Sequence, residues 1–207
     1  MPELNEHYHS TFGAVQESEH IFIRNGFRSV SANPVKILEI GFGTGLNAVL
    51  TLKEAQKSRI EIVYHALEVF PVTEEIWKQL EYDTDHQQFN LLHEAPWNKE
   101  VEISPSFHLK KIKADLTALA SETISSSEDQ YDLVYFDAFG PAVQPEMWTE
   151  QIFRYLISAM KQGGILVTYS VKGTVKRALK AAGFSIEKLP GPAGKREMLR
   201  AMKINLK

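Results

Sequence analysis

One short stretch, ILEIGFGTGLN at residues 37–47, constrains the fold of this chain more than any other. An apolar, strand-like run ends in three alternate glycines, and the residues after them have the apolar spacing of a helix. Glycine at such a junction allows positive φ angles and close approach of the backbone to a ligand. The stretch therefore predicts a strand–loop–helix unit whose loop binds a ligand beside the first turn of the helix.

Strand-like and helical stretches alternate along most of the chain. Strands are expected at 35–43, 60–70, 107–115, 131–139, 165–170, 184–190 and 195–204, and helices at 46–58, 73–83, 146–162 and 174–183. Thr73 is the expected N-cap of the second helix, and Gly163 and Gly164 are expected to end the third. This alternation is typical of an α/β fold with a parallel sheet. We expect a Rossmann-like, mostly parallel seven-stranded sheet over residues 35–207, whose last two strands form an antiparallel edge hairpin.

Two segments fall outside this pattern. Residues 1–34 fit no strand–helix unit, so we expect an N-terminal extension that forms a short hairpin or a lid. The stretch SETISSSEDQ at 121–130 is expected to be a loop.

The composition is that of a soluble globular domain, with 43% hydrophobic and 24% charged residues in 207. The absence of cysteine excludes disulfides and thiolate metal sites, and the seven histidines show no metal-ligand spacing, so no metal is expected. The N-terminus lacks the features of a secretory signal, and no apolar run is long enough to span a bilayer. We therefore expect a cytoplasmic protein without a membrane partner.

Charge is distributed unevenly along the chain. Residues 151–207 contain 12 Lys and Arg but only two acids, whereas the whole chain has a net charge of −3. A basic segment of this kind either binds phosphates or only solvates helix faces, and charge alone does not separate the two.

Acidic residues end four successive predicted strands: Glu39, Glu68, Asp115 and Asp137. Ligands of open α/β sheets bind at the carboxyl ends of the strands. Each of these acids taken alone could be a helix N-cap. Their recurrence at the same end of four strands indicates a binding edge.

The surroundings of the glycine loop favour one class of ligand. Leu46 stands where a dinucleotide-binding loop has its third glycine, and Glu39 beneath the loop is a poor neighbour for a pyrophosphate. S-adenosylmethionine, with its ammonium, carboxylate and sulfonium groups, suits these residues better. We expect the loop to bind this cofactor through Glu39, Gly41, Phe42, Gly43, Thr44, Gly45 and Asn47.

The other strand-end acids receive separate roles. Glu68 is expected to bind the ribose and Asp115 the adenine amino group. Asp137, beside the sulfonium, would face a methyl acceptor, and Phe139 and Pro141 would form a rigid wall there. For Trp148, core packing is favoured over stacking on a substrate.

Four stretches resemble the methyltransferase domain of the MnmC family and its stand-alone MnmD members: YHSTFGAVQESEHIFIRNG, EIGFGTGLN, YFDAFGPAVQPEMW and GKREML. The resemblance spans nearly the whole chain. It departs at Ala138, where the family has glycine, and at Gly140, where alanine is usual, which implies a slightly different acceptor pocket.

The resemblance implies a class I S-adenosylmethionine-dependent enzyme that methylates 5-aminomethyl(-2-thio)uridine at the wobble position of tRNA. It also implies that Asp137 is catalytic, with Glu17 engaging the substrate amine, and that Lys195 and Arg196 lie near the acceptor or the tRNA phosphates. The basic C-terminal segment then predicts further tRNA contacts at Lys172, Lys176 and Arg177, on or beside one expected helix. Because the chain stops at Lys207, we expect no flavin-dependent oxidase and therefore a separate enzyme that supplies the aminomethyl substrate. We also expect a monomer rather than an oligomer.

Two other functions remain open. A small-molecule amine methyltransferase or aminopropyltransferase can use the same fold, but the basic C-terminal segment argues against a small cationic acceptor. A non-catalytic RNA-binding module is disfavoured by the glycines and the four acids.

Overall fold

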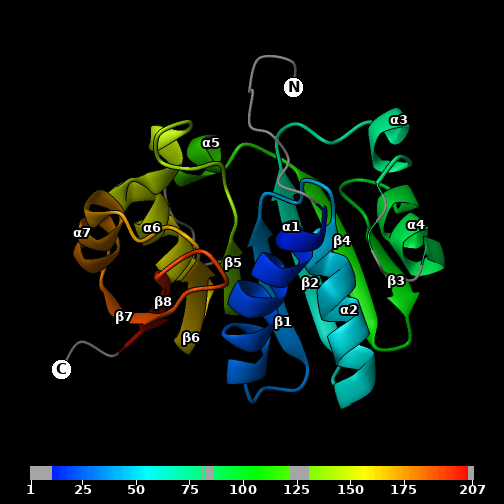
Figure 1. Cartoon of the computed structure of the whole chain (residues 1–207), viewed down its shortest axis with the longest axis horizontal. Helices are drawn as coiled ribbons and strands as arrows, with labels where there is room; N and C mark the ends of the chain where they lie inside the picture. Colours follow the sequence, from blue (N-terminus) through cyan, green and yellow to red (C-terminus); the bar gives the residue numbers. More distant parts are fainter. Residues whose placement is uncertain (1–10, 81, 83–85, 122–130, 205–207) are drawn as a thin grey trace.

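The computed structural model of the chain describes residues 11–80, 82, 86–121 and 131–204 (Figure 1). Helices pack on both faces of one sheet, whose strands are β1 (Val35–Ile40), β2 (Ile62–Glu68), β3 (Glu100–Ser104), β4 (Phe107–Lys113), β5 (Tyr131–Phe136), β6 (Met160–Thr168), β7 (Phe184–Pro190) and β8 (Glu197–Lys203). Nearly all of the loop predicted at 121–130 lies outside the described residues.

The strand order is β3-β4-β2-β1-β5-β6-β8-β7. The five strands β4, β2, β1, β5 and β6 are parallel, whereas β8 runs antiparallel to both β6 and β7. The predicted parallel α/β sheet and its closing edge hairpin are thus confirmed. The predicted count of seven strands is wrong by one, because β3 adds an antiparallel strand beside β4.

The two faces of the sheet carry separate apolar cores. Successive residues of a strand point to opposite faces, so Leu133 and Tyr135 enter one core while Val134 and Phe136 enter the other. The helices are α1 (Thr11–Ser18), η1 (Glu19–Arg24), η2 (Phe27–Ser29), α2 (Leu46–Ser58), α3 (Glu74–Trp77), α4 (His86–Glu94), α5 (Leu116–Ser121), η3 (Pro145–Trp148), α6 (Glu150–Ala159) and α7 (Gly173–Ala181). None of them has the length and apolar character needed to cross a membrane.

From residue 11 on, the N-terminal segment is helical, so the expected hairpin is wrong, and its role as a lid stays a prediction. Helix α1 continues into the π-helical turn η1, and both lie with α2 on one face of the sheet (Figure 1). Three successive residues, Ile21, Phe22 and Ile23, are buried in the core of that face. The wider turn of a π-helix carries three neighbouring apolar residues inward, a pattern that matches neither strand nor α-helix periodicity.

The third predicted helix has different ends from those expected. It begins with the 3₁₀ turn η3, and α6 starts after Thr149, whose Oγ1 accepts a hydrogen bond from the Ile152 N–H. It ends at Ala159, and Gly163 and Gly164 lie within β6. A Cβ at Gly164 would be 3.0 Å from the Tyr131 carbonyl oxygen, so this glycine allows close strand packing. The second predicted helix is also shorter: Thr73 is its N-cap, but α3 ends at Trp77.

Strand β1 marks the point where the chain changes direction across the sheet. From β1 the chain proceeds through β2 to β4 on one side, and later returns to place β5 and β6 on the other. Such switch points open a crevice at the carboxyl ends of the two central strands, where ligands of open α/β sheets bind. Here those strands are β1 and β5, which are followed directly by Gly41 and Asp137.

Candidate active site

The glycine loop and the loop after β5 meet at this switch point. The Asp137 N–H donates to the Ile40 carbonyl oxygen at 3.0 Å, and Gly41 has a φ of 90°. A Cβ at Gly41 would lie 2.9 Å from the Asp137 carbonyl oxygen, so a side chain would force the loops apart. By contrast, a Cβ at Gly43 would meet no atom within 4 Å, which leaves open space above the middle of the loop.

One amide joins two of the predicted acids. The Asn47 Nδ2 donates to Glu39 Oε1 at 3.0 Å and to Asp137 Oδ2 at 2.8 Å. Glu39 is fully buried, and its other oxygen, Oε2, has no hydrogen-bond partner among the described residues. The structure therefore brings Glu39, Asn47 and Asp137 together as the sequence predicted for one site.

Both carboxyls in this network are harder to ionise than usual. Burial raises the pKa of Glu39 well above its ordinary value, against the opposing effect of the Asn47 hydrogen bond. Burial likewise raises the pKa of Asp137 to about 6, while the Asn47 hydrogen bond and the positive charge of Lys195 lower it and the negative charge of Glu17 raises it. Asp137 thus titrates close to neutral pH.

Glu68 contacts the loop from the end of β2. Its Oε2 accepts from the Gly43 N–H at 3.0 Å, and its Oε1 accepts from the Phe70 N–H at 2.9 Å. The carboxylate therefore joins the glycine loop to the loop that follows β2. Its predicted contact with a ribose stays a prediction.

Asp115 caps a helix at the same edge of the sheet. Its Oδ1 accepts from both the N–H (2.8 Å) and the hydroxyl (2.7 Å) of Thr117, in the first turn of α5. These two hydrogen bonds lower the pKa of Asp115. The capping function that the sequence left open is therefore present, and binding of adenine by this residue stays a prediction.

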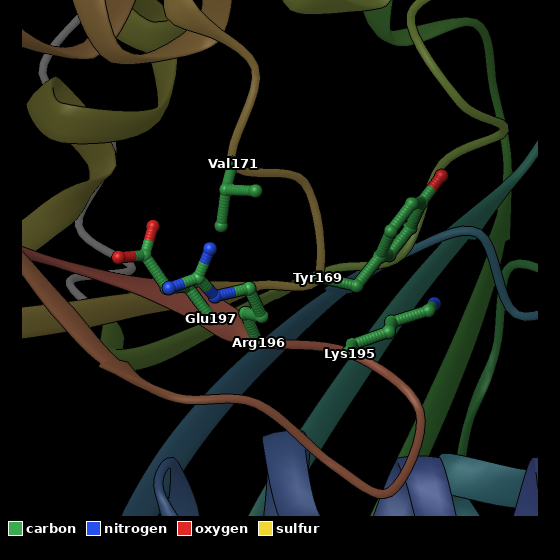
Figure 2. Close-up of a pocket in the computed structure, with 5 residues that line it drawn as sticks. All are labelled: Tyr169, Val171, Lys195, Arg196 and Glu197. Carbon is green, nitrogen blue, oxygen red and sulfur yellow. The ribbon is translucent and has the colours of Figure 1, made fainter.

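Opposite the glycine loop, α1 and the β7–β8 hairpin meet beside Asp137. The Lys195 Nζ lies 2.6 Å from Glu17 Oε1 and 5.1 Å from the centre of the Tyr169 ring. Figure 2 shows Lys195 and Tyr169 side by side, with Val171 and Arg196 lining the same open depression of about 470 Å³. The Tyr169 hydroxyl donates to the Ala138 carbonyl oxygen at 2.7 Å, which ties this depression to the loop after Asp137.

The loop after β5, which was predicted to form a rigid wall with Phe139 and Pro141, is anchored through its backbone. The Trp148 Nε1–H donates to the Phe139 carbonyl oxygen at 2.8 Å, and Trp148 itself is buried, so the preference for core packing is confirmed. Phe139 exposes 42% of its surface, and Pro141 is half-buried. The loop therefore presents an aromatic side chain from a fixed backbone.

Most of the predicted tRNA-binding residues lie along the segment that follows Tyr169. Lys172 is the N-cap of α7, and Lys176 and Arg177 lie in that helix. Arg196 lines the depression beside Tyr169. Within the described part of the chain, no ion pair involves any of these four cations, whereas Lys195 is paired with Glu17.

Sequence reasoning missed the residues that support Thr44 in the glycine loop. The Tyr82 hydroxyl donates to Thr44 Oγ1 at 2.7 Å, and the His93 Nε2 lies 3.0 Å from the Thr44 carbonyl oxygen. His93 occupies an apolar position of α4, four residues after the buried Phe89. A polar residue at such a position was the available signal.

Residues 81–204 match the sequence profile of a family described as S-adenosyl-L-methionine-dependent methyltransferase. The chain belongs to this family. Its cofactor is therefore S-adenosyl-L-methionine, as the residues of the glycine loop predicted. Among the described residues, no group of three or more His, Asp or Glu is arranged to hold a metal ion.

Relatives of this methyltransferase include larger proteins. The bifunctional protein MnmC of Leptospira borgpetersenii, named for tRNA 5-methylaminomethyl-2-thiouridine biosynthesis, is 31% identical over 93% of this chain. The protein of the same name from Aromatoleum aromaticum is 34% identical, also over 93% of the chain. The chain spans about a third of the length of these curated relatives, 31% and 32% respectively.

Among solved structures, MnmC2 from Aquifex aeolicus superposes with a TM-score of 0.74 at 22% identity, covering 94% of this chain and 64% of that one. Spermidine synthase from Thermotoga maritima superposes with a TM-score of 0.55 at 15% identity, covering 93% and 61%. At these identities the likeness shows the fold alone. It confirms the Rossmann-like architecture expected from the alternating elements.

The crevice suits the cofactor by its own chemistry. The N-cap of α2 is Gly45, which has no side chain to accept hydrogen bonds from the N–H groups of the first turn. Such a helix start favours a carboxylate, and the acidic residues beneath the loop favour an ammonium. The open space above Gly43 leaves room for a ligand at the loop. The amino-acid part of S-adenosylmethionine carries both groups.

Proposed function

We propose that this methyltransferase transfers the methyl group of S-adenosylmethionine to the primary amine of 5-aminomethyl(-2-thio)uridine at the wobble position of tRNA. The observation that carries the proposal is the position of Asp137. Its carboxylate accepts a hydrogen bond from Asn47 on the donor side. On the open side, the charges of Glu17 and Lys195 shift its pKa. The names of the relatives from Leptospira and Aromatoleum support the same acceptor.

In this proposal the donor lies along the carboxyl ends of β1, β2 and β4. The loop residues Gly41 to Gly45 and Asn47 bind its amino-acid part, and the buried Glu39 beneath them has an oxygen, Oε2, available to accept a hydrogen bond from its ammonium. Glu68 and Asp115 bind the ribose and the adenine. When bound, the cofactor supplies a methyl group on a sulfonium, which is electrophilic and leaves a neutral thioether.

Asp137 performs the proton chemistry at the acceptor. An alkylamine is largely protonated at neutral pH and has no lone pair for attack in that state. The ionised Asp137 carboxylate binds the ammonium through Oδ1 or Oδ2, accepts one proton from it and passes that proton to water. The freed nitrogen lone pair then forms the N–CH₃ bond as the S–CH₃ bond breaks, which gives a secondary ammonium.

The acceptor loop positions the nucleoside for this step. The base must leave the anticodon stack to reach Asp137, and the exposed face of Phe139 is available to stack on it. Pro141 restricts the loop beside it. In-line transfer depends on such positioning for much of its rate.

The basic residues beyond Tyr169 hold the rest of the tRNA. Lys172, Lys176, Arg177 and Arg196 have no acidic partner among the described residues, so each can neutralise a phosphate. Lys195 joins them once tRNA displaces its contact with Glu17, and Glu17 then becomes available to the substrate amine. The proposed reaction takes place in the cytoplasm and follows another activity that provides the aminomethyl group.

The test is methyl transfer from labelled S-adenosylmethionine into tRNA isolated from cells that lack this modification, followed by nucleoside analysis. We expect label in 5-methylaminomethyl(-2-thio)uridine and in no other nucleoside. Donor binding without label in RNA would overturn the proposed acceptor and would direct attention to small amines. Label in a different nucleoside would retain tRNA as the acceptor but refute the role of Asp137 with an amine.

A further inference from the structure

The proposed reaction gives no role to His93, yet this side chain bonds directly to the glycine loop. Its Nε2 lies 3.0 Å from the Thr44 carbonyl oxygen. A carbonyl can only accept, so Nε2 must carry the proton, and the imidazole acts as a donor to the loop. The imidazole also packs closely on Gly45, because a Cβ at that residue would lie 3.0 Å from the same nitrogen.

This hydrogen bond completes the fixation of one peptide group. The N–H of Gly45 donates to the Phe42 carbonyl oxygen at 2.8 Å, and the carbonyl of the same peptide, on Thr44, accepts from His93. The Thr44 side chain is held as well, because its Oγ1 accepts from the Tyr82 hydroxyl. The peptide plane at the start of α2 is therefore restrained from both sides.

Aromatic contacts hold the imidazole in place. It stacks on Trp77 with a centroid distance of 4.8 Å and an interplanar angle of 13°, and it also contacts Phe89 (4.6 Å) and Phe42 (5.5 Å). Burial in this cluster lowers the pKa of His93 to about 4, so the ring is neutral at physiological pH. A neutral ring has one N–H, and the Thr44 carbonyl determines which nitrogen bears it.

The backbone of His93 is anchored by a buried lysine. The Lys111 Nζ donates to the His93 carbonyl oxygen at 2.6 Å and lies between the rings of Phe42 and Trp97, at 5.4 and 4.9 Å. Only 1% of Lys111 is exposed. A cation at the end of α4 stabilises the orphan carbonyls of that helix.

We infer that His93 is a positioning residue for the methyl donor, which orients the Thr44–Gly45 peptide of the donor loop through its Nε2–H. The residue also links the two loops that border the donor. One is the glycine loop itself, and the other follows Glu68 and leads to Trp77 on α3. The inference concerns only the binding of the methyl donor, so it does not depend on the identity of the methyl acceptor.

Two substitutions of nearly equal length separate positioning from packing. His93→Gln keeps an N–H donor that can reach Thr44, whereas His93→Met fills the same space with an apolar chain that has no donor. We expect the Met variant to bind S-adenosylmethionine about tenfold more weakly, because the loop loses one hydrogen bond. The Gln variant should bind within about twofold of the wild type. Isothermal titration calorimetry measures both.

Thermal unfolding without donor provides the second readout. The site is an aromatic cluster, so a purely structural role predicts that Met is tolerated at least as well as Gln in both melting temperature and donor affinity. The inference predicts that the Gln variant binds the donor more tightly than the Met variant. It predicts no such order in melting temperature. His86→Met, at an exposed position of the same helix, is the control and should change neither quantity. Wild-type affinity in the Met variant, or equal losses of affinity in Met and Gln variants, would overturn the inference.

Discussion

The carboxylate of Asp137 is buried at a place where its ionisation costs stability. Its pKa in the folded protein, about 6, lies above the value of 3.8 that the residue has in a model peptide. The folded state therefore binds a proton more tightly than the unfolded chain does. The stabilising effect of that proton is complete below about pH 4 and is lost as the pH rises through about 6.

Replacement of Asp137 by Asn should reveal this cost. The neutral amide keeps the size of the side chain but removes the buried charge, so we expect the Asn variant to gain stability relative to the wild type as the pH rises. The difference between the variants should grow between pH 4 and pH 7 and reach about 3 kcal/mol. Chemical denaturation over this pH range measures it, and a difference independent of pH would contradict the raised pKa.

Methyl transfer should depend on pH in the opposite direction. The proposed step needs an ionised carboxylate, so the single-turnover rate of the wild type with saturating donor should fall as the pH decreases through about 6. A rate that stays constant from pH 7 to pH 5 would show that Asp137 does not titrate in the reacting complex.

The sequence predicted which candidate residues at the ends of strands lie together. Glu39, Asn47 and Asp137 could be identified because a parallel sheet brings the ends of its strands together. The roles of His93 and Lys111 could not be predicted, because the periodicity of their stretches indicates only a helix and a strand. Their roles depend on a contact between α4 and the glycine loop, which no local pattern encodes.

At the scale of elements, the N-terminal segment forms part of the core. Phe22 is 2% exposed and its ring lies 5.1 Å from that of Tyr135 on β5. Its neighbours Ile21 and Ile23 are completely buried in the same apolar cluster. The turn η1 therefore stabilises the central strands, while α1, just before it, carries Glu17 to its ion pair with Lys195.

Truncation of Phe22 to Ala should accordingly destabilise the whole domain. Removal of a buried aromatic ring costs about 3–5 kcal/mol through lost burial and the cavity left behind. We expect the free energy of unfolding, measured by chemical denaturation, to fall by that amount, with a single cooperative transition. A loss below about 1 kcal/mol would mean that the segment only rests on the domain.

Elements with regular periodicity were predictable, and those with irregular backbone were not. Helix α2 has the bounds expected from its spacing, since one face packs on the sheet. The turn η1 and the two glycines in β6 depart from simple rules: the first has a wider helical turn, and Gly164 packs against the backbone of β5. In both places tertiary packing decides the conformation.

At the scale of the molecule, positive charge is concentrated at one end of the sheet. This end is formed by residues 151–207, which include β6, β7, β8 and α7. These residues contain 12 basic side chains and only two acidic ones. Several of these cations pair with acids, but Lys176 and Arg177 on α7 have no ion pair in the described part of the chain. They are the natural contacts for a polyanion in the proposed complex.

Reversal of both charges, Lys176→Glu with Arg177→Glu, should weaken tRNA binding and reduce its salt dependence. Each lost phosphate contact lowers the magnitude of the slope of log K against log salt by about 1. Filter binding at several salt concentrations measures the slope. Lys57→Glu, exposed near the end of α2, is the control. A slope unchanged by the double reversal would place the tRNA elsewhere.

The central claim is that Asp137 acts on the methyl acceptor and not on the donor. The most direct measurement compares the wild type with Asp137→Asn in two quantities, the dissociation constant for S-adenosylmethionine and the single-turnover rate of transfer to unmodified tRNA. We predict a dissociation constant within about threefold of the wild type and a rate reduced at least about a hundredfold. A variant that transfers methyl groups at the wild-type rate, or one that loses only donor affinity, would contradict the account.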